Sequence, residues 1–282
     1  MTRIVCVGEL LVDMIGKESG DLTETQRFVK RAGGAPANVA VAASRLGEDV
    51  DMVATVGPGE LGDFLVEKMD QENVAIGDIR RAEQKTTLAF AALDEDAEPH
   101  FSFYRGADRH ITEEQFEFNL WDDAIVHLGS LPWTNQESRE NLMEFLRETE
   151  ATVSFDPNLR EDLLDDEYTD FLSDLLNRVD ILLAAEHEIE FFGPDLVGQV
   201  DEVVISRGSD GAKLIADETY EVQPPEVDVK DTTGAGDALA GAYLAYRSDG
   251  KKVALDKAVK AAAVSTEKKG AMKSLPQGSD LA

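Results

Sequence analysis

Residues 124–159, AIVHLGSLPWTNQESRENLMEFLRETEATVSFDPNL, contain two apolar runs on either side of an acidic segment. The runs AIVHLGSL (124–131) and TVSFDPNL (152–159) are short and apolar, as buried strands are, whereas ESRENLMEFLRETE (137–150) has the pattern of a helix. The same alternation continues in two further apolar runs, DILLAAE (180–186) and EVVISRG (202–208). Strands that alternate with helices predict a parallel sheet covered on both faces, with ligands bound beyond the carboxyl ends of the strands.

The first hundred residues depart from this alternation in two places. RIVCVGELLVDMIG (3–16) begins as a central strand that ends between Gly8 and Asp13. Strands expected within about 10–31 and 85–105, the second of them a hairpin, find no place in the alternation. We expect them to form a small separate sheet that acts as a lid. We find no domain boundary and predict a single domain over residues 1–282.

The charge of the chain is strongly negative, with 57 acidic and 27 basic residues and a formal net charge of -30. A disordered acidic chain, a partner for basic surfaces and a protein adapted to concentrated salt are three explanations. Regular apolar runs argue against disorder. The acidic residues are spread along the chain and form no tail, so we favour a halophilic surface whose self-repulsion is screened by salt. Such a surface repels phosphates and anionic lipids, so we expect neither nucleic acid nor a membrane as a partner.

The cysteine and histidine content argues against disulfide and zinc chemistry. Cys6 is the single cysteine and lies in an apolar run, which predicts a buried thiol and excludes a disulfide within the chain. This fits the reducing cytoplasm, which is the location we expect. No apolar run approaches the roughly 18 residues of a membrane span. The four histidines do not have the spacing of metal ligands.

A glycine-rich motif, DTTGAGDALAGA (231–242), combines features of an anion site with a carboxylate. Small and apolar residues at helical spacing predict a helix that begins near Gly234. Its free amides and the positive end of its dipole suit a phosphoryl group. Asp237 would repel a stored phosphate, but it would suit a base that takes a proton from an attacking hydroxyl. The alternative is a first-turn acid that only stabilises the helix.

Two other nucleotide-binding patterns are missing from the sequence. It has no GxxxxGK[ST] motif, so a Walker-type site is not supported. Gly241 comes too late to complete the three-glycine fingerprint of a dinucleotide site, which argues against an NAD-dependent oxidoreductase.

A second motif, RAGGAPANVAVAASRLG (31–47), places Gly33 and Gly34 before a helix that is closed by Gly47. Asn38 stands near the start of that helix. Its amide has donors and an acceptor, as binding of a polyol requires. The alternative is an asparagine that caps the helix.

Together, GGAPANVAVAASRLG and DTTGAGDALAGAYLAY resemble the two signatures of the ribokinase-like (PfkB-type) carbohydrate kinases. The resemblance covers nearly the whole chain. Smaller matches lie between them, at VGPGELGD (56–63), FSFYRGAD (101–108), SFDPNLR (154–160) and ISRGSDGA (205–212). The family fold implied is a three-layer α/β/α structure with a mainly parallel central sheet and a small β-sheet lid. The activity implied is transfer of the γ-phosphate of ATP to a hydroxymethyl group of a sugar.

The resemblance also implies roles for individual residues. Asp237 would be the catalytic base, and Gly234, Ala235 and Gly236 would form the anion hole. Asp13, Gly33 and Asn38 would bind sugar hydroxyls. Beyond what the resemblance implies, we expect Gly34, Phe103, Arg105 and Arg160 at the substrate site. The nucleotide would contact Ser206, Gly208, Gly211 and Thr233. ATP and Mg²⁺ are the implied cofactors, Glu188 the residue implied near the metal, and K⁺ a further activator.

One position departs from the family pattern. Relatives have an Asn-x-x-Glu motif where this chain has DILLAAEHEIEFF, so that Ala185 replaces the asparagine while Glu188 is kept. The metal role of Glu188 is therefore in doubt. Because Mg²⁺ mostly keeps its waters, losing one amide need not abolish activity.

The substrate prediction rests on SFYRGAD, SFDPNLR and GGAPANVA, which look most like the fructokinase branch. We expect fructose, with 2-keto-3-deoxygluconate, ribose or a nucleoside as alternatives. Arg105 could hold either a hydroxyl or a carboxylate, and Arg160 could offset charge on the transferred phosphate. A catalytically decayed sugar or nucleotide sensor is the non-enzyme alternative. The resemblance also leads us to expect a homodimer formed through the lid.

Overall fold

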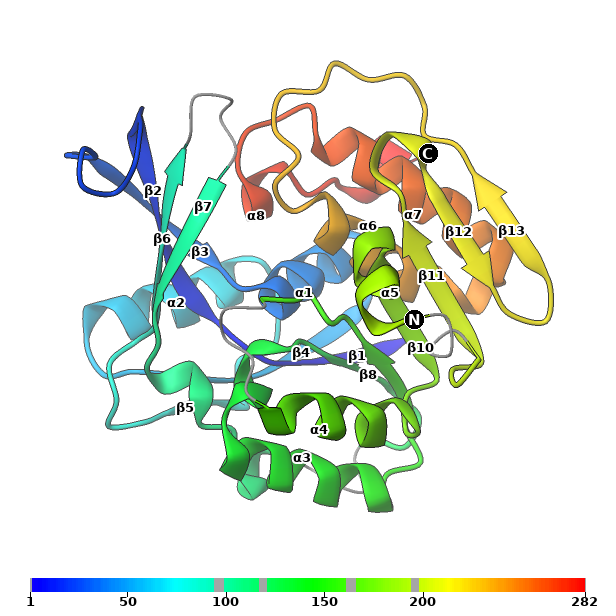
Figure 1. Cartoon of the computed structure of the whole chain (residues 1–282), viewed down its shortest axis with the longest axis horizontal. Coiled ribbons are helices and arrows are strands. Elements are labelled where there is room, and N and C mark those ends of the chain that lie inside the picture. Colours follow the sequence, from blue (N-terminus) through cyan, green and yellow to red (C-terminus); the bar gives the residue numbers. More distant parts are fainter. Residues whose placement is uncertain (1, 94–98, 117–120, 161–165, 194–197, 282) are drawn as a thin grey trace.

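A nine-stranded sheet forms the centre of the molecule. The structure, a computed structural model, describes residues 2–93, 99–116, 121–160, 166–193 and 198–281. The strand order is β13-β12-β11-β10-β9-β8-β1-β4-β5, and all neighbours from β11 to β5 are parallel (Figure 1). The strands are β1 (Arg3–Val7), β4 (Asp49–Val56), β5 (Ile79–Arg81), β8 (Ile125–Leu128), β9 (Thr152–Phe155), β10 (Ile181–Ala185), β11 (Glu202–Ser206), β12 (Ala212–Ile215) and β13 (Thr219–Val222). Only β12 and β13 add in antiparallel fashion.

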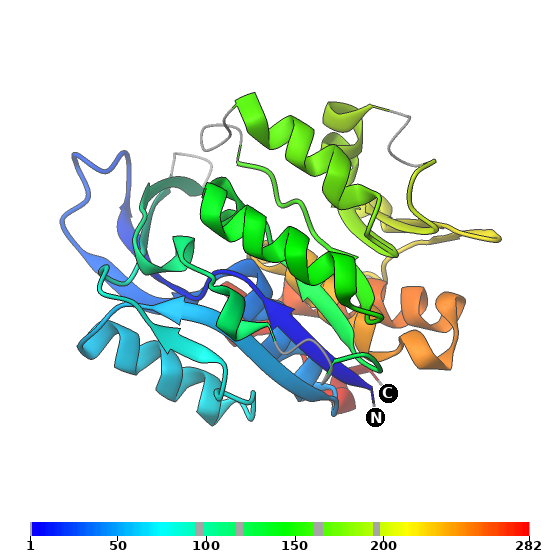
Figure 2. The same ribbon diagram turned by 90° about the horizontal axis from the view of Figure 1, so that it is seen from below.

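Helices cover both faces of this sheet, so that its central strands are buried on both sides. In β1, Ile4 and Cys6 pack into one apolar cluster, whereas Val5 and Val7 pack into a second cluster across the sheet. The first cluster includes α1 (Ala35–Arg45), α2 (Glu60–Gln71), α6 (Ala235–Ala245) and α7 (Lys251–Ser265). The second includes α3 (Gln136–Glu148) and α4 (Asp166–Leu176), which lie side by side in Figure 2. Two short helices are α5 (Glu186–Phe192) and α8 (Ala271–Ser274). The predicted three-layer α/β/α fold is confirmed.

A second, four-stranded sheet stands beside the central sheet (Figure 1). Its order is β3-β2-β6-β7, in which β2 and β6 are parallel and the two outer pairs are antiparallel. The strands are β2 (Leu11–Ser19), β3 (Phe28–Gly33), β6 (Leu88–Leu93) and β7 (Pro99–Tyr104). They occupy the two segments predicted to form a separate sheet. We refer to this sheet as the lid; its closing movement, like the description of the chain as a single domain, stays a prediction.

The first strand region is divided between the two sheets. β1 ends at Val7 and β2 begins at Leu11, so the chain leaves the central sheet at the turn that contains Gly8 and Glu9. A Cβ atom at Gly8 would lie 2.5 Å from Pro36 Cγ, so only glycine lets the chain pass the start of α1 here. The short edge strand β5 was not predicted, because three residues give too little pattern.

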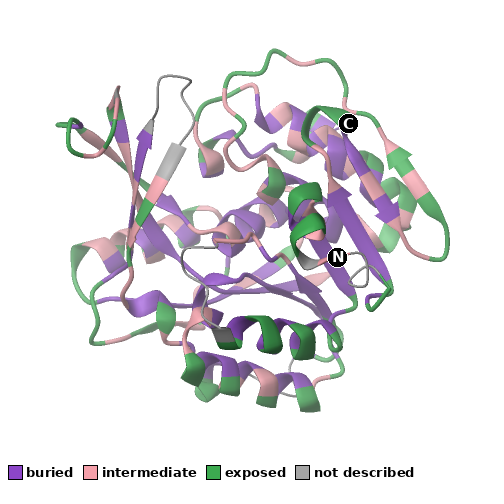
Figure 3. Ribbon diagram, viewed as in Figure 1, coloured by how far each residue is buried: buried purple, intermediate pink, exposed green. Residues whose placement is uncertain are grey.

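In the described part of the chain, nearly all acidic side chains are exposed or half-buried, classes that Figure 3 colours green and pink. Among the described residues, only four acidic side chains are buried: Glu9, Asp108, Glu188 and Glu202. Because like charges on the surface repel one another and salt screens them, we expect stability and activity to require molar KCl. Thermal melting between 0.1 and 3 M KCl, a range over which the Debye length falls from about 10 Å to below 3 Å, tests this expectation. Equal melting temperatures across the range would contradict it.

A membrane-spanning helix and a disulfide are both absent from the described part of the chain. None of its helices is both long and apolar enough to span a lipid bilayer. Cys6 is buried and free, as its apolar surroundings predict.

Candidate functional site

A pocket of about 380 Å³ lies between the lid and the carboxyl ends of β9, β10 and β11, where the first turns of α1 and α6 also meet. This is the edge of a parallel sheet at which ligands bind in such folds. The predicted site residues that line it are Asp13, Gly34, Asn38, Phe103, Arg160, Glu188, Ser206, Thr233, Gly234, Gly236 and Asp237. They come from segments far apart in the sequence, so the fold brings both glycine motifs to one place.

The first turn of α6 presents a carboxylate and open backbone to the pocket. Gly234 has φ 82°, and a Cβ there would lie 2.7 Å from Ala271 Cβ, so glycine is required at this turn. A Cβ at Gly236 would meet nothing within 4 Å, which leaves its backbone accessible. The amide of Ala235 is already used, because it donates to the Thr232 carbonyl at 3.1 Å. The turn can therefore receive an anion through its glycines next to Asp237.

Asp237 is paired with the other motif. Asn38 Nδ2 donates a hydrogen bond of 2.7 Å to Asp237 Oδ2. The helices that carry these residues pack very closely, since a Cβ at Gly241 of α6 would lie 2.5 Å from Ala42 Cβ of α1. Burial raises the pKa of Asp237 to about 6, although the hydrogen bond from Asn38 and the charge of Arg160 both lower it. The half-buried carboxylate is thus mostly ionised near neutral pH and can accept a proton.

Three further carboxyl groups make the pocket acidic. Burial raises the pKa of Asp13 to about 7, and the charge of Asp237 adds to this effect. Burial also raises the pKa of Glu9 to about 7. Asp156 has its pKa raised well above the ordinary value by burial and by the nearby charges of Glu188, Asp237 and Glu9. Because neighbouring carboxylates disfavour ionisation of Asp13 and Asp156, a cation or a hydroxyl donor is the partner that suits the pocket.

Glu188 braces the backbone around the pocket. Its Oε1 accepts from the Leu159 amide at 2.7 Å, and its Oε2 accepts from the Ala185 amide at 2.8 Å. The carboxylate thereby joins the loop after β9, which carries Arg160, to the end of β10. In the described part of the chain, no three acidic, histidine or cysteine side chains are grouped so that they could hold a metal ion.

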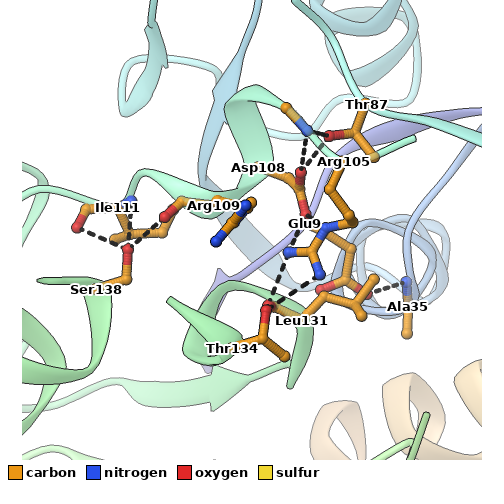
Figure 4. A network of polar contacts seen from close by, with 11 residues as sticks. Glu9, Ala35, Thr87, Arg105, Asp108, Arg109, Ile111, Leu131, Thr134 and Ser138 are labelled. Carbon is orange, nitrogen blue, oxygen red and sulfur yellow. Dashed lines mark hydrogen bonds and ion pairs between the residues drawn. The ribbon is translucent and has the colours of Figure 1, made fainter. Parts of the chain in front are cut away.

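Arg105 does not line the pocket; it lies at the base of the lid (Figure 4). Its Nε donates to Asp108 Oδ2 at 2.6 Å and its Nη2 to the Leu131 carbonyl at 2.8 Å. Nη1 donates to Thr134 Oγ1 at 3.2 Å. Thr87 is hydrogen-bonded to Asp108 and to the Gly106 amide. The guanidinium therefore ties β7 to the segment after β8, and its charge is matched by Asp108.

Four other predicted residues do not line the pocket: Gly33, Ala235, Gly208 and Gly211. At Gly33, a Cβ would lie 2.0 Å from Asp13 Oδ2, so the glycine makes room for that carboxylate. Gly211 has φ 78°, and a Cβ there would lie 1.9 Å from the Val222 carbonyl oxygen. Gly208 also has a positive φ, 55°, and faces open space.

Sequence reasoning missed several lining residues, chiefly Glu9, Asp156, Asn158, His187 and Ala271. Glu9 and Asp156 follow closely on the ends of β1 and β9, so the rule about carboxyl ends was a usable signal for both. Ala271 had no such signal, because only the packing of α8 against Gly234 brings it to the pocket.

Comparisons with known proteins agree with this geometry. The family model described as pfkB family carbohydrate kinase matches residues 1–278. Fructokinase-1 of Zea mays is 35% identical over 99% of this chain and 96% of its own length. The solved structure of a sugar kinase from Pyrococcus horikoshii has a TM-score of 0.91 at 34% identity, covering 99% of this chain and 96% of that chain. The fructokinase of Xylella fastidiosa, solved with bound ATP, has a TM-score of 0.88 at 29% identity, covering 99% and 96%.

Proposed function

Because the chain belongs to the pfkB family of carbohydrate kinases, we propose that it phosphorylates a hydroxymethyl group of a neutral monosaccharide, with fructose as the leading acceptor. The family makes it an ATP-dependent sugar kinase, a phosphotransferase with an alcohol group as acceptor. One observation carries the proposed mechanism. Asp237 lies in the pocket at the first turn of α6, beside accessible glycine backbone.

In this mechanism Asp237 is the general base. The acceptor hydroxyl attacks the γ-phosphorus of ATP in line, and the Asp237 carboxylate takes the hydroxyl proton. The bond from the γ-phosphorus to the β,γ-bridging oxygen breaks, so that ADP leaves. The glycine backbone of the turn, at Gly234 and Gly236, stabilises charge on the transferred group, together with the amide of Ala235 if the turn releases it from Thr232. Arg160 lines the same pocket and supplies positive charge. The lid would exclude water that competes as acceptor.

Nucleotide binding is proposed for the pocket beyond Asp237. Ser206 and Thr233 line it, and Gly208 and Gly211 form the turn after β11 that would support the nucleotide. The carboxyl groups of the pocket fit a hydrated Mg²⁺ that is bound to the phosphates of ATP. This ion would neutralise part of the phosphate charge. Since both oxygens of Glu188 accept backbone amides, Glu188 would act on that ion through water.

K⁺ remains a further proposal. Asp231 accepts from the amides of Thr233 and Gly270, so it joins two loops beside α6. A monovalent ion that ordered these loops would act on the first turn of α6.

The charge of the pocket supports a neutral acceptor. Glu9 and Asp13 lie at its lid side, and among the described lining residues Arg160 is the single arginine or lysine. Arg105, the candidate for binding a carboxylate, is already matched by Asp108. Above about pH 7, where Glu9 and Asp13 are mostly ionised, an anionic acceptor such as 2-keto-3-deoxygluconate would therefore be repelled, whereas fructose, ribose or a nucleoside would bind through hydroxyls.

An acceptor panel tests this proposal. ATP consumption is measured with fructose, ribose, adenosine, fructose 6-phosphate and 2-keto-3-deoxygluconate in molar KCl with Mg²⁺. We expect kcat/KM to be highest for fructose and lowest for the two anions, and NMR of the product identifies the phosphorylated hydroxyl. A kcat/KM for 2-keto-3-deoxygluconate far above that for fructose would contradict fructose as the acceptor. ATP binding without transfer to any acceptor would favour the sensor.

The outer face of the lid supports the proposed homodimer. Phe28, Phe90 and Tyr104 form a row of edge-to-face rings with centroids 5.3 and 5.4 Å apart. Tyr104 is 66% exposed, and a second copy of the lid could cover it. The cytoplasm stays our prediction for the location of the enzyme.

A further inference from the structure

The contact between Asn38 and Asp237 joins the two motifs through helices far apart in sequence. Asn38 is 5% exposed, and its Nδ2 donates to Asp237 Oδ2 at 2.7 Å. Its Oδ1 is buried and has no hydrogen-bond partner among the described residues. The amide of Asn38 therefore has one bond to the carboxylate and one acceptor still free.

The position of Asn38 is held from three sides. Its backbone amide donates to the Gly34 carbonyl at 2.9 Å, which starts α1 directly after lid strand β3. The Ala35 amide donates to Glu9 Oε1 at 3.1 Å, which fastens the first turn to the end of β1. On its other side α1 packs against α6, and a Cβ at Gly241 of α6 would lie 2.9 Å from the Val39 carbonyl oxygen. The backbone of Asn38 is therefore fixed relative to α6, which keeps its side chain within reach of Asp237.

We propose that Asn38 is a positioning residue for the base: it holds Oδ2 of Asp237 so that Oδ1 faces the acceptor hydroxyl. This inference rests on the proposed function, in which Asp237 accepts the proton. It goes beyond a sugar contact, because the bond from Asn38 acts on the orientation and charge of Asp237. A carboxylate free to rotate about its Cβ–Cγ bond would spend less time with an oxygen aimed at the acceptor hydroxyl.

The surrounding charges make this hydrogen bond matter for proton transfer. Asp13 from β2 and Asp156 after β9 are carboxyl groups close to Asp237, and Arg160 opposes them. The pocket-lining residues of α1 and α8 (Ala35, Asn38 and Ala271) are uncharged. Donation from Asn38 favours the ionised base, so its loss raises the pH needed to deprotonate Asp237.

Two variants of Asn38 separate positioning from sugar binding. Asn38→Leu removes the hydrogen-bond donor at similar size. Asn38→Asp keeps the shape of the side chain but replaces the amide with an acid, and it serves as the second variant if the leucine variant folds poorly. We expect kcat at pH 7 to fall roughly 100-fold, as for a misplaced catalytic group, with a change in the Kd for sugar of only a few-fold. The acidic limb of the kcat–pH profile should move to higher pH in both variants. Ser44→Ala, at the other end of α1, is the control and should keep the wild-type profile, because the Ser44 hydroxyl donates to the Glu72 and Asn73 carbonyls, which do not line the pocket.

Two other outcomes would contradict the positioning role of Asn38, for different reasons. A raised KM with kcat and the pH profile unchanged would overturn the positioning role and leave Asn38 as a sugar contact. Wild-type enzyme that binds ATP but transfers phosphate to none of the sugars would instead refute the proposed function, and the positioning role with it. Calorimetric titration with sugar supplies the Kd independently of turnover.

Discussion

Replacing Asp237 by asparagine is expected to lower kcat for sugar phosphorylation by roughly 100- to 10,000-fold, which is the range for losing a general base. The amide has the shape of the carboxylate and keeps an oxygen that can accept from Asn38 Nδ2, so the pocket and its affinity for substrates should persist. It cannot take the proton of the attacking hydroxyl. The measurement is kcat and KM for fructose and ATP, together with the Kd of each ligand.

The matched control is Asp249→Asn, which removes one negative charge just beyond the other end of α6, where Asp249 is exposed. It should leave kcat unchanged. In the wild-type enzyme, kcat should fall as the pH drops below about 6, because Asp237 becomes protonated there. Near-normal turnover by the Asp237→Asn variant would contradict the proposed role of Asp237 as the general base.

The sequence predicted the fold well where the signal was local. Predicted strands of the central sheet such as β8 and β10 are short, mainly apolar segments, and burial on both faces favours that composition. The start of α6 was also predictable, since Gly234 and the small residues after it mark a helix beginning. Strand order was beyond reach, because β1 lies between β4 and β8 through contacts between distant segments.

The candidate site was predictable in part for the same reason. Asp237 and Asn38 each stand in a local motif, but the hydrogen bond between them depends on how α1 and α6 pack. Arg105 was expected near the ligand, whereas Asp108, three residues later in the sequence, takes its charge. Such a pair is readable as opposite charges at close spacing, but only the fold decides whether the pair or a ligand binds the guanidinium.

Glu9 is a buried acid that no motif identified. It is 3% exposed, its Oε1 accepts from the Ala35 amide, and its Oε2 is buried without a partner among the described residues. Burial raises its pKa from 4.5 to about 7. The folded protein therefore binds more protons than the unfolded chain between these values, so the contribution of Glu9 to stability falls as the pH rises through this window.

Glu9→Gln is accordingly expected to become more stable relative to wild type as the pH rises from 5 to 8. With 1.36 kcal/mol for each unit of pKa shift, the relative gain is on the order of 3 kcal/mol, and it is complete above about pH 7. Glutamine keeps the oxygen that accepts from Ala35, and any loss from its unpaired NH₂ group is the same at both pH values. The difference between pH 5 and pH 8 therefore isolates the charge of Glu9. Urea unfolding of both proteins at constant KCl measures it.

Glu114→Gln provides the control, because Glu114 is exposed and distant from the pocket lining. Its stability relative to wild type should not change between the two pH values. A difference between Glu9→Gln and wild type that is independent of pH would mean that Glu9 ionises at its ordinary pKa. A loss of stability that grows with pH would mean that the ionised carboxylate has a partner, such as Arg105, in solution. The expected result would instead show that the fold tolerates an unfavourable acid at the lid side of the pocket, where charge that repels anions would suit the proposed neutral acceptor.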